Sequence, residues 1–592
     1  MIQGIGASSG IAIGRTFVLP NWEWEVPEQQ IDVADFAKEF DRVYEGIRTS
    51  KVEIEQIKDE LKDVVGSNET MIFDAHIAIL DDPVFMNEIQ GIIQRQYKAA
   101  EVAVKEAIDH FVTMFDLLDD DYMKDRALDI KDVGNRLLKH LLGAPEIKLP
   151  SDTQPFILIA KELSPSQLAN LNQDHVLGIV TLAGSTTSHT AIMARALGIP
   201  LVVGIESMLD RPIQTGEKII IDGGDGAVFL NPKKQQITEY LKKRDKQDEE
   251  KKLLSQIADI PSATPDGKKL KLSANISSLK ELEIALTCSA DGVGLFRTEF
   301  LYMDRTKFPQ EEEQFEIYRK VAERLEGSSI VIRTLDIGGD KQLDYFQTPE
   351  EDNPFLGYRA IRISLARKDL FKTQLRAILR ASYYGNVKIM YPLITSLDEV
   401  RAANAVLEEA KRELEEEGHP YDSSIQIGVM IEVPAAVMIA DLLAEEVDFF
   451  SIGTNDLLQF TLAVDRMNEE IAHLYEPFHP AMLRMLKYTV ESAKKCGIPV
   501  SVCGELAGNP LALPIWLALD VDGISMSAHS ILRVKKRLLD TCQSDSKEVV
   551  QQLLSCRTSD EMKARLNDFL AAVDKKKRCA PLAHEEPFHG EV

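Results

Sequence analysis

The stretch 183–195 reads AGSTTSHTAIMAR and places one histidine, His189, where a hydroxyl-rich turn passes into an apolar helical pattern. An apolar run at 175–181 precedes the turn and is typical of a buried strand. At a helix start, free backbone N–H groups and the helix dipole favour an anion. Imidazole titrates near neutral pH, so one ring nitrogen can be a nucleophile. These features suit a histidine that carries phosphate; a histidine merely hydrogen-bonded by its hydroxyl neighbours is the simpler alternative.

Three arginines lie at or just beyond short apolar runs farther along the chain. Arg297 and Arg333 directly follow such runs, and Arg466 lies just past a later one. A planar guanidinium group can bind the paired oxygens of a phosphate or a carboxylate. Taken singly, each arginine is more often part of a surface ion pair. Together they predict a site for a small anion.

Two carboxylates follow neighbouring runs in the same region. Glu432 directly follows the fifth run, and Asp456, preceded by Asn455, follows the sixth. Mg²⁺ commonly takes one or two protein carboxylates and completes its shell with substrate oxygens and water. We therefore expect Glu432 and Asp456 to share Mg²⁺. The alternative is that these carboxylates only pair with the arginines.

Cys503 begins the sequence CGELAG, after the seventh run. This segment is predicted to be an exposed turn, where a thiol near cations can donate a proton or act as a nucleophile. Cys288 and Cys496 are expected to be ordinary small apolar residues. The six cysteines of the chain form no CxxC pair, which favours reduced thiols and a cytoplasmic location.

The elements that position these side chains are predicted by eight short apolar runs that alternate with helical patterns. The runs are 271–276, 292–296, 330–332, 387–390, 427–431, 449–452, 500–502 and 523–525. Repeated strand-then-helix units predict a parallel sheet, and eight of them predict a closed (β/α)8 barrel over 261–575. In a barrel all the residues after the runs lie on one face, where active sites form. An open doubly wound sheet is the alternative.

The N-terminal half predicts an α/β domain that is interrupted by helices. Residues 1–24 and 144–232 are rich in Gly, Ile and Val, whereas 25–143 shows helical periodicity, with 25 acidic and 14 basic residues between 31 and 140. We expect the two flanks to fold together around a helical insertion. Its acidity predicts a solvated surface or a docking face for a basic partner. The remaining segments are a charged helical linker at 233–260 and a disordered tail at 576–592.

The length, charge and hydropathy of the chain exclude several classes of function. The chain has 592 residues, too many for one hydrophobic core, and is predicted to be a multidomain α/β protein. A formal charge of −27 argues against nucleic-acid binding and favours small molecules or basic proteins as partners. No apolar run reaches membrane-spanning length, and the N-terminus lacks the features of a signal peptide, so we expect no membrane association.

Six motifs give a specific resemblance. They are TTSHTAIMAR at 186–195, GLFRTEF at 294–300, RTLDIGGDK at 333–341, NPFLG at 353–357, IGTNDL at 452–457 and CGELAG at 503–508. In this order they resemble Enzyme I of the bacterial sugar phosphotransferase system, a phosphoenolpyruvate–protein phosphotransferase. The resemblance extends from about residue 1 to residue 575.

The resemblance implies a role for each candidate residue. His189 would be the phosphohistidine, modified on Nε2, and Cys503 would be the acid that protonates the enolate to pyruvate. Phosphoenolpyruvate would be bound by Arg297, Arg333, Asn455, Asp456 and Arg466, with Glu432 and Asp456 on Mg²⁺. The helical insertion would dock the phosphocarrier protein HPr, and the barrel would form a homodimer. The linker would allow the histidine domain to swing between barrel and partner.

One departure and two alternatives accompany the resemblance. Ser185 and Thr186 replace the second glycine and the arginine of the usual GGRTSH loop, so a cation beside His189 is lost. Pyruvate phosphate dikinase and phosphoenolpyruvate synthase share the histidine loop and the barrel, but they carry a large ATP-binding domain before the histidine. Only 188 residues precede His189, without a Gly-rich nucleotide signature. A non-catalytic regulatory protein is the other alternative, against which the complete set of reactive residues argues.

Overall fold

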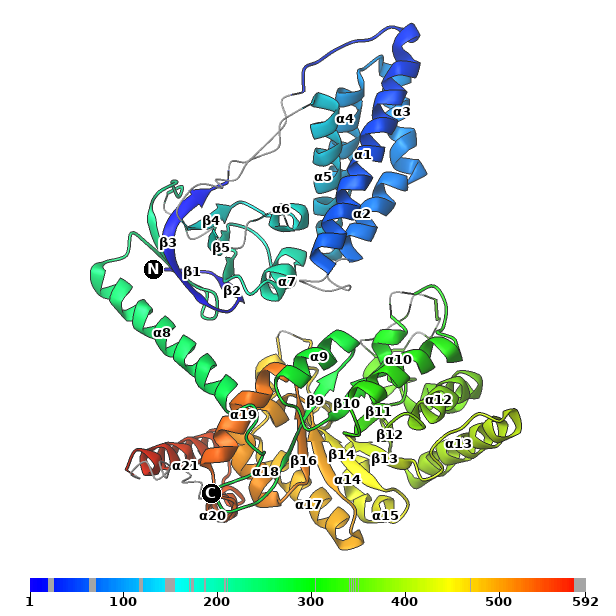
Figure 1. Ribbon diagram of the computed structural model, residues 1–592, viewed down its shortest axis with the longest axis vertical. Coiled ribbons are helices and arrows are strands. Elements are labelled where there is room, and N and C mark those ends of the chain that lie inside the picture. Colours follow the sequence, from blue (N-terminus) through cyan, green and yellow to red (C-terminus); the bar gives the residue numbers. More distant parts are fainter. Residues whose placement is uncertain are drawn as a thin grey trace, which may run out of the picture. The chain divides into compact units, whose positions relative to one another are not determined.

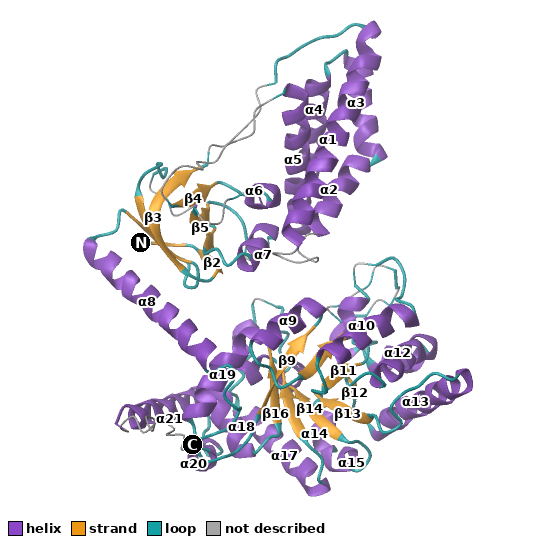
Figure 2. Cartoon of the chain, in the orientation of Figure 1, coloured by secondary structure: helices purple, strands orange, loops and turns teal. Residues whose placement is uncertain are grey.

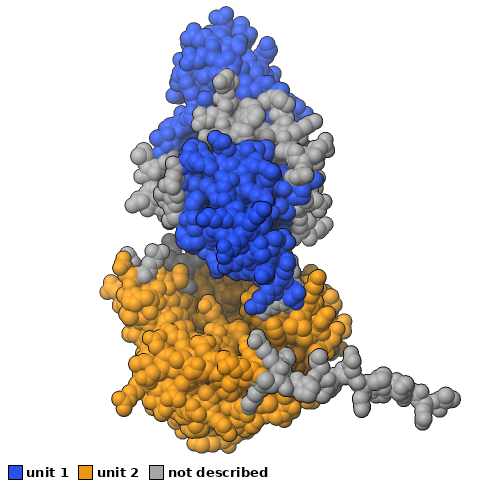
Figure 3. Space-filling view, turned by 90° about the vertical axis from the view of Figure 1, so that its left-hand side faces the viewer, with its two compact units in different colours: residues 1–249 blue, residues 250–592 orange. Residues whose placement is uncertain are grey.

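The computed structural model divides into two compact units, residues 1–249 and 250–592, which are coloured separately in Figure 3. The residues that the structure describes are 1–19, 26–62, 71–116, 121–143, 155–169, 171, 175–185, 188–206, 209, 211–303, 305–339, 341, 343, 345–346, 348–349, 351–468 and 470–579. Each unit has its own hydrophobic core.

One mixed sheet forms the centre of the N-terminal unit. In spatial order its strands are β1 (Ile2–Gln3), β8 (Ala227–Leu230), β7 (Lys218–Asp222), β3 (Ile11–Val18), β4 (Phe156–Ala160), β5 (Val176–Thr181), β6 (Leu201–Val203) and β2 (Ile5–Ser8). β3, β4, β5 and β6 run parallel, and the outer pairs are antiparallel. Both flanks contribute strands to this one sheet, and β3 of the first flank lies between β7 and β4 of the second, so the predicted α/β domain with an insertion is confirmed.

The insertion is a bundle of long helices between β3 and β4 (Figure 1). After a short 3-10 turn, Val33–Asp35, come α1 (Phe36–Lys62), α2 (Met71–Asp81), α3 (Pro83–Gln96), α4 (Ala100–Asp116) and α5 (Asp121–Leu142). Asp82 begins α3 by accepting a hydrogen bond from the Val84 N–H, and Pro83 suits the first turn. Apolar residues at helical spacing, among them Ile54, Phe73, Ile89 and Leu137, are buried between the helices.

Two short helices follow strands of the sheet: α6 (Pro165–Ala169) after β4 and α7 (His189–Ala196) after β5. The bundle is fixed to this part of the unit by the Ser164 hydroxyl, which donates to the Asp132 carboxylate of α5 at 3.0 Å. The expected charged linker is the helix α8 (Lys234–Gln256), and the boundary between the two units falls within it, after Glu249.

The C-terminal unit is a closed parallel barrel, shown with its surrounding helices in Figure 2. Its strands are β9 (Lys271–Ile276), β10 (Val293–Arg297), β11 (Ile330–Arg333), β12 (Val387–Tyr391), β13 (Gln426–Ile431), β14 (Phe449–Gly453), β15 (Val500–Cys503) and β16 (Gly523–Met526), with β16 pairing β9. All eight predicted strands are present, so the barrel is confirmed and the open sheet is wrong.

Helices surround the barrel and bury its outer face against apolar residues such as Ile378, Leu407 and Trp516. They are α9 (Leu279–Thr287), α10 (Glu311–Arg324), α11 (Ile361–Ala366), α12 (Lys368–Ser382), α13 (Leu397–Glu417), α14 (Pro434–Met438), α15 (Ala440–Ala444), α16 (Thr454–Leu462), α17 (Pro480–Cys496), α18 (Leu513–Leu519) and α19 (Ala528–Asp540). Two further helices, α20 (Gln543–Leu553) and α21 (Ser559–Cys579), follow.

The expected disordered tail, 576–592, needs a correction at its start. Helix α21 runs on to Cys579, so residues 576–579 are helical. Apolar residues at helical spacing, Met562, Leu566, Leu570 and Val573, are buried and hold this helix. Residues 580–592 lie outside the described part of the chain.

Candidate active site

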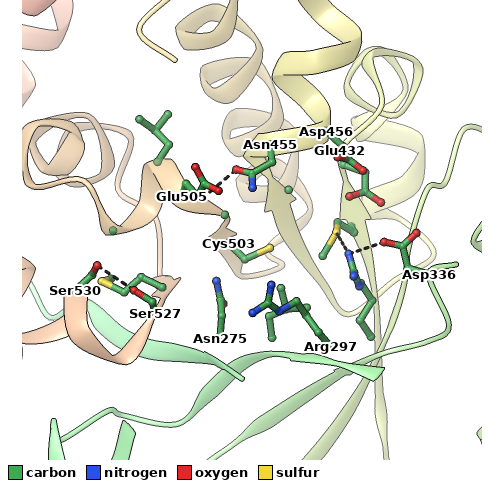
Figure 4. Close-up of a pocket in the computed structure, with 18 of the residues that line it drawn as sticks. Asn275, Arg297, Asp336, Glu432, Asn455, Asp456, Cys503, Glu505, Ser527 and Ser530 are labelled. Atoms are coloured by element: carbon green, nitrogen blue, oxygen red, sulfur yellow. Dashed lines mark hydrogen bonds and ion pairs between the residues drawn. The ribbon is translucent and has the colours of Figure 1, made fainter. Parts of the chain in front are cut away.

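A cavity of about 850 Å³ opens at the carboxyl ends of the barrel strands. Figure 4 shows side chains from several different strands and loops converging on it. The cavity is lined by all the barrel residues singled out in the sequence: Arg297, Arg333, Glu432, Asn455, Asp456, Arg466 and Cys503. Parallel strands carry their carboxyl ends to one face of the barrel, which explains how residues so far apart in sequence meet.

Arg333 ends β11 and is fixed by two buried carboxylates. Its Nη2 lies 2.7 Å from Glu299 Oε1, and its Nη1 lies 3.0 Å from Asp336 Oδ2. Lys341 Nζ contacts the same two carboxylates at 2.9 and 3.1 Å. Burial opposes ionisation, yet Arg333 and Lys341 hold the pKa of Asp336 well below its usual range and also lower the pKa of Glu299. Two cations are therefore held rigidly at this wall.

Asp456, in the first turn of α16, lies between two more arginines. Arg359 Nη2 is 3.1 Å from Asp456 Oδ2, and Arg466 Nη1 is 2.9 Å from Oδ1. Arg359 also contacts Asp336 at 3.1 Å, while its Nε and Nη1 are buried and have no hydrogen-bond partner among the described residues. The simpler interpretation, in which the carboxylates pair with arginines, therefore holds for Asp456, and unused guanidinium donors remain.

Arg297 is differently placed. It ends β10, its guanidinium carbon lies 5.5 Å from the centre of the Phe300 ring, and its Nε is buried without a hydrogen-bond partner among the described residues. Figure 4 shows this side chain pointing into the cavity, near Asn275. A guanidinium group without a carboxylate partner can bind an anionic ligand.

Glu432, which follows β13, makes no ion pair within the described residues. Its Oε1 accepts a hydrogen bond from the Leu393 N–H at 2.7 Å. Burial, together with the nearby carboxylates of Asp456 and Asp336, raises the pKa of Glu432 to about 8. A Cβ on Gly453 would lie 2.9 Å from Glu432 Oε2, so the glycine leaves room for the carboxylate. Carboxylates that repel one another in this way fit a divalent cation.

The protein supplies only part of a metal shell. Among the described residues, no three His, Cys, Asp or Glu side chains form a group that could hold a metal ion. Glu432 and Asp456 are near enough that the Asp456 carboxylate helps to raise the pKa of Glu432, and both are labelled in Figure 4. Mg²⁺ often uses only one or two protein carboxylates and takes substrate oxygens and water for the rest. The donor set therefore fits a metal that binds together with an anionic substrate.

Cys503 corrects one prediction. It ends β15 and is only 2% exposed, so it does not lie in an exposed turn. The turn begins at Gly504, whose φ of 118° favours glycine. Burial raises the pKa of the Cys503 thiol to about 11; the Ser451 hydroxyl opposes this rise and the Glu432 carboxylate adds to it. The thiol is therefore protonated at neutral pH, which suits an acid and not a nucleophile.

His189 is the first residue of α7, as predicted for a helix-start histidine. Ser188 begins this helix, because its hydroxyl oxygen accepts a hydrogen bond from the Ala191 N–H at 3.3 Å and its hydroxyl donates to the Ser185 carbonyl at 3.0 Å. The imidazole of His189 and the whole of Thr186 lie outside the described part of the structure.

Several charged residues of the cavity were missed in the sequence, among them Glu299, Asp336, Lys341 and Arg359. The first three lie within the motifs GLFRTEF and RTLDIGGDK, and Arg359 comes two residues after NPFLG. The sequence did contain a clue to these residues, because positive and negative side chains occur together in these motifs. Several arginines that converge on one buried site require carboxylates that balance their charge and fix their positions. The sequence analysis considered only residues at or near the strand ends, so it missed the charged residues that pair with them.

Comparisons with known proteins agree with this site. Residues 3–126, 153–226 and 251–542 match families described as PEP-utilising enzyme, N-terminal; PEP-utilising enzyme, mobile domain; and PEP-utilising enzyme, PEP-binding domain. The N-terminal match covers the first strands and much of the bundle, the second covers the histidine loop, and the third covers the barrel. No helix in the described part of the chain is long and apolar enough to cross a membrane.

Among the relatives that match nearly the whole chain are two phosphoenolpyruvate-protein phosphotransferases. The phosphoenolpyruvate-protein phosphotransferase of Staphylococcus aureus (strain MSSA476) is 42% identical over 96% of this chain and 99% of its own. That of Geobacillus stearothermophilus is 44% identical over 95% of this chain and 96% of its own. A solution structure of Enzyme I (nEIt) is 33% identical, covers 42% of this chain and 100% of its own, and has a TM-score of 0.35.

These matches favour neither the dikinase-like alternative nor the non-catalytic one. The relatives share a name, and the three family matches follow one another in the order of the structural parts. The chain therefore belongs to the phosphoenolpyruvate–protein phosphotransferases, the Enzyme I family of the bacterial phosphotransferase system.

Proposed function

We propose that His189 attacks the phosphorus of phosphoenolpyruvate through Nε2 while the substrate lies in the barrel cavity. The imidazole lone pair forms the N–P bond, and the P–O bond breaks with its electron pair moving to the enol oxygen. The observation that carries this proposal is the set of buried cations around one cavity, which matches the charge of a phosphate next to a carboxylate.

Arg297, Arg333, Asn455, Asp456 and Arg466 bind the substrate. Arg333 is held by Glu299 and Asp336, so its position is fixed before the substrate arrives. Arg297 is free of carboxylate partners among the described residues and can turn its donors to the ligand. Asp456 contributes to this binding by orienting Arg466, with which it forms an ion pair.

We propose that the divalent metal ion used by this family is Mg²⁺ in this protein and that Glu432 and Asp456 bind it. When bound, the ion neutralises charge on the phosphoryl group. The raised pKa of Glu432 supports this assignment, since burial and its carboxylate neighbours favour a proton in the absence of another cation. Cys503 then protonates the enolate carbon to give pyruvate, because its thiol is kept protonated in the wall of the cavity.

The phosphohistidine passes its phosphoryl group to HPr, which docks on the helices of the insertion. The acidic excess of this region supports a basic partner, and exposed apolar residues on these helices, Tyr44, Val84, Met114 and Leu128, provide contact area. Free cysteines, among them Cys288 and Cys496, support a reducing, cytoplasmic location.

The barrel forms a homodimer. Met438 of α14 and Leu442 of α15 are 66% and 49% exposed and lie on neighbouring short helices. Large apolar side chains exposed close together mark an association surface. Replacing Leu442 by Asp should shift the protein to monomers in sedimentation equilibrium, whereas Leu253→Asp, at an exposed leucine of α8, should not.

The deciding experiment is incubation with phosphoenolpyruvate labelled in the phosphate, with and without Mg²⁺, followed by mapping of the label. An acid-labile phosphate on His189, formed only with the metal and released to HPr, would support the proposal. Label on another residue, or a requirement for ATP, would refute it.

A further inference from the structure

Ser451 places a hydroxyl group inside the barrel, next to Cys503. It lies on β14 and is 1% exposed. In the register of β14 and β15, Ser451 pairs with Ser501 and Gly453 pairs with Cys503, so the side chains of Ser451 and Cys503 face the same side of the sheet. The Ser451 Oγ donates a hydrogen bond to Cys503 Sγ at 3.2 Å.

The hydrogen bond from Ser451 to Cys503 contributes little to the stability of the fold. A buried hydroxyl group costs free energy unless it is hydrogen-bonded, and sulfur is a weak acceptor. The hydrogen bond to Cys503 is the one side-chain bond of Ser451 Oγ among the described residues. Ser501, on the neighbouring strand β15, has a stronger acceptor, because its hydroxyl donates a hydrogen bond to the Phe450 carbonyl oxygen. An alanine at position 451 would satisfy the packing at less cost.

The direction of the hydrogen bond bears on the chemistry. Because Ser451 donates, the sulfur accepts, and the S–H bond of Cys503 is left to point elsewhere. Cys503 lines the cavity, whereas Ser451 does not. Figure 4 shows the Cys503 sulfur projecting into the cavity above Arg297. The hydroxyl thus approaches the sulfur from within the barrel wall and leaves the substrate side to the thiol hydrogen.

We propose that Ser451 is a positioning residue for the protonation step: its hydroxyl orients the Cys503 thiol toward the enolate and stabilises the thiolate that remains. The inference rests on the proposed role of Cys503 as the acid. In the step, the S–H proton moves to the methylene carbon of the enolate, the S–H electron pair stays on sulfur, and the enolate becomes the ketone of pyruvate. Water in the cavity returns a proton to the thiolate.

The size of the effect follows from the change in charge. A hydrogen bond to a neutral thiol is weak, but the same bond to a thiolate is charge-assisted and considerably stronger. Ser451 therefore favours the product side of the proton transfer and contributes little to substrate binding. Removing it should slow pyruvate formation by roughly tenfold or more and leave KM for phosphoenolpyruvate unchanged.

The test compares Ser451→Ala with the matched control Ser501→Ala, in the full chain with saturating phosphoenolpyruvate and Mg²⁺. Pyruvate formation is followed in water and in D₂O, and melting curves check the fold. Ser451→Ala should slow the reaction and increase the ratio of rates in water and D₂O, because proton transfer becomes limiting. Ser501→Ala should match the wild-type chain in both measurements.

A double-mutant cycle separates positioning from a structural role. In the Cys503→Ala background, adding Ser451→Ala should cause no further loss, since Ser451 acts through the thiol. A wild-type rate in Ser451→Ala, or the same loss in both backgrounds, would overturn the proposal and leave the role of Cys503 intact. A wild-type rate in Cys503→Ala would overturn both.

Discussion

Lys243 of helix α8 and Asp222 at the end of β7 form an ion pair with an N–O distance of 2.7 Å. Asp222 also accepts hydrogen bonds from the N–H groups of Gly224 and Asp225, so its carboxylate is fixed within the turn after β7. The neighbouring Tyr240 ring lies against Phe229, with 5.2 Å between ring centroids. The first half of α8 is therefore part of the N-terminal unit and does not act as a loose tether.

This contact defines a fragment for a test of divided chemistry. Residues 1–258 keep the sheet, the helical insertion, His189 and all of α8, and they lack the barrel site. We expect the fragment to fold alone, to accept phosphate from phosphorylated HPr, and to remain unlabelled by phosphoenolpyruvate and Mg²⁺. Transfer from HPr should weaken with added salt if acidic helices meet a basic carrier.

Lys243→Met is a matched variant of this fragment. It keeps the length of the side chain and removes its charge, so helix α8 should become more mobile while transfer from HPr continues. Labelling of the unaltered fragment by phosphoenolpyruvate would contradict a site located in the barrel. A fragment that folds but exchanges phosphate with no HPr would contradict the partner assignment.

His189→Ala should abolish labelling from phosphoenolpyruvate, because the nucleophile is removed. A change at one helix-start residue should alter the free energy of unfolding by less than about 1 kcal/mol. The measurement is acid-labile label per chain, with circular dichroism as the check of fold. His110→Ala, on α4 of the insertion, is the control and should be labelled normally. A His189→Ala protein that still takes up acid-labile label would mean that another residue is the acceptor.

Glu432→Gln should raise the Mg²⁺ concentration needed for half-maximal activity by tenfold or more, in line with loss of one metal ligand. In the wild-type chain the carboxylate must lose its proton before it binds the ion. Its pKa of about 8 therefore predicts that Mg²⁺ affinity rises as the pH increases toward 8. The Glu432→Gln protein should lose this part of the pH dependence. An unchanged metal requirement would make Glu432 a structural residue.

The same carboxylate predicts an effect on stability without metal. The pKa of Glu432 rises from its ordinary 4.5 to about 8 in the folded protein, so the folded state binds more protons between these values. The Glu432 carboxyl group thus makes its full contribution to the free energy of unfolding below about pH 4.5, and this contribution is lost as the pH approaches 8. Glu432→Gln should stabilise the metal-free protein at pH 8 by an amount on the order of a few kcal/mol, and less at pH 5. Melting curves at both values measure the difference.

The thiols should react in the order Cys496, Cys288, Cys503 at pH 7.5. Cys496 is exposed, burial raises the pKa of Cys288, and Cys503 is buried with a pKa near 11. The sequence alone predicted an exposed Cys503, and the structure shows instead that this thiol is buried. Mass spectrometry after timed alkylation gives the three rates, and Cys496→Ser should lose the fast phase. Rapid alkylation of Cys503 would mean that the thiol is accessible and ionised in solution.

The barrel could be predicted in detail because each strand contains a short apolar run, and several of these runs are followed directly by a polar residue. Arg297, Arg333 and Cys503 are the last residues of their strands, so strand ends in the sequence located the cavity directly. The sheet of the N-terminal unit was predicted from composition, but its strand order was not. Nothing in the sequence of β2 shows that it pairs with β6.

Burial and pairing could not be derived from the sequence. The segment CGELAG has the composition of an exposed turn, but the chain emerges only after Cys503, which the neighbouring strands cover. Likewise Asp336 and Arg359 are 23 residues apart in the sequence, and no local pattern shows that their side chains form an ion pair. Such contacts arise from tertiary structure, where local pattern carries no signal.

The insertion leaves the sheet after β3 and returns at β4, and these two strands are parallel neighbours that pair from Arg15 with Phe156 to Val18 with Ile159. The sheet is thus continuous across the insertion, while apolar residues of the bundle, the sheet and α7 share one hydrophobic core. Within such a design, the exposed faces of the helices can change in charge or sequence while the buried faces keep the support of the histidine loop. With the carrier protein docked on these helices as proposed, selection can alter which carrier is recognised without altering the phosphoryl-transfer chemistry, and the two properties can evolve at different rates.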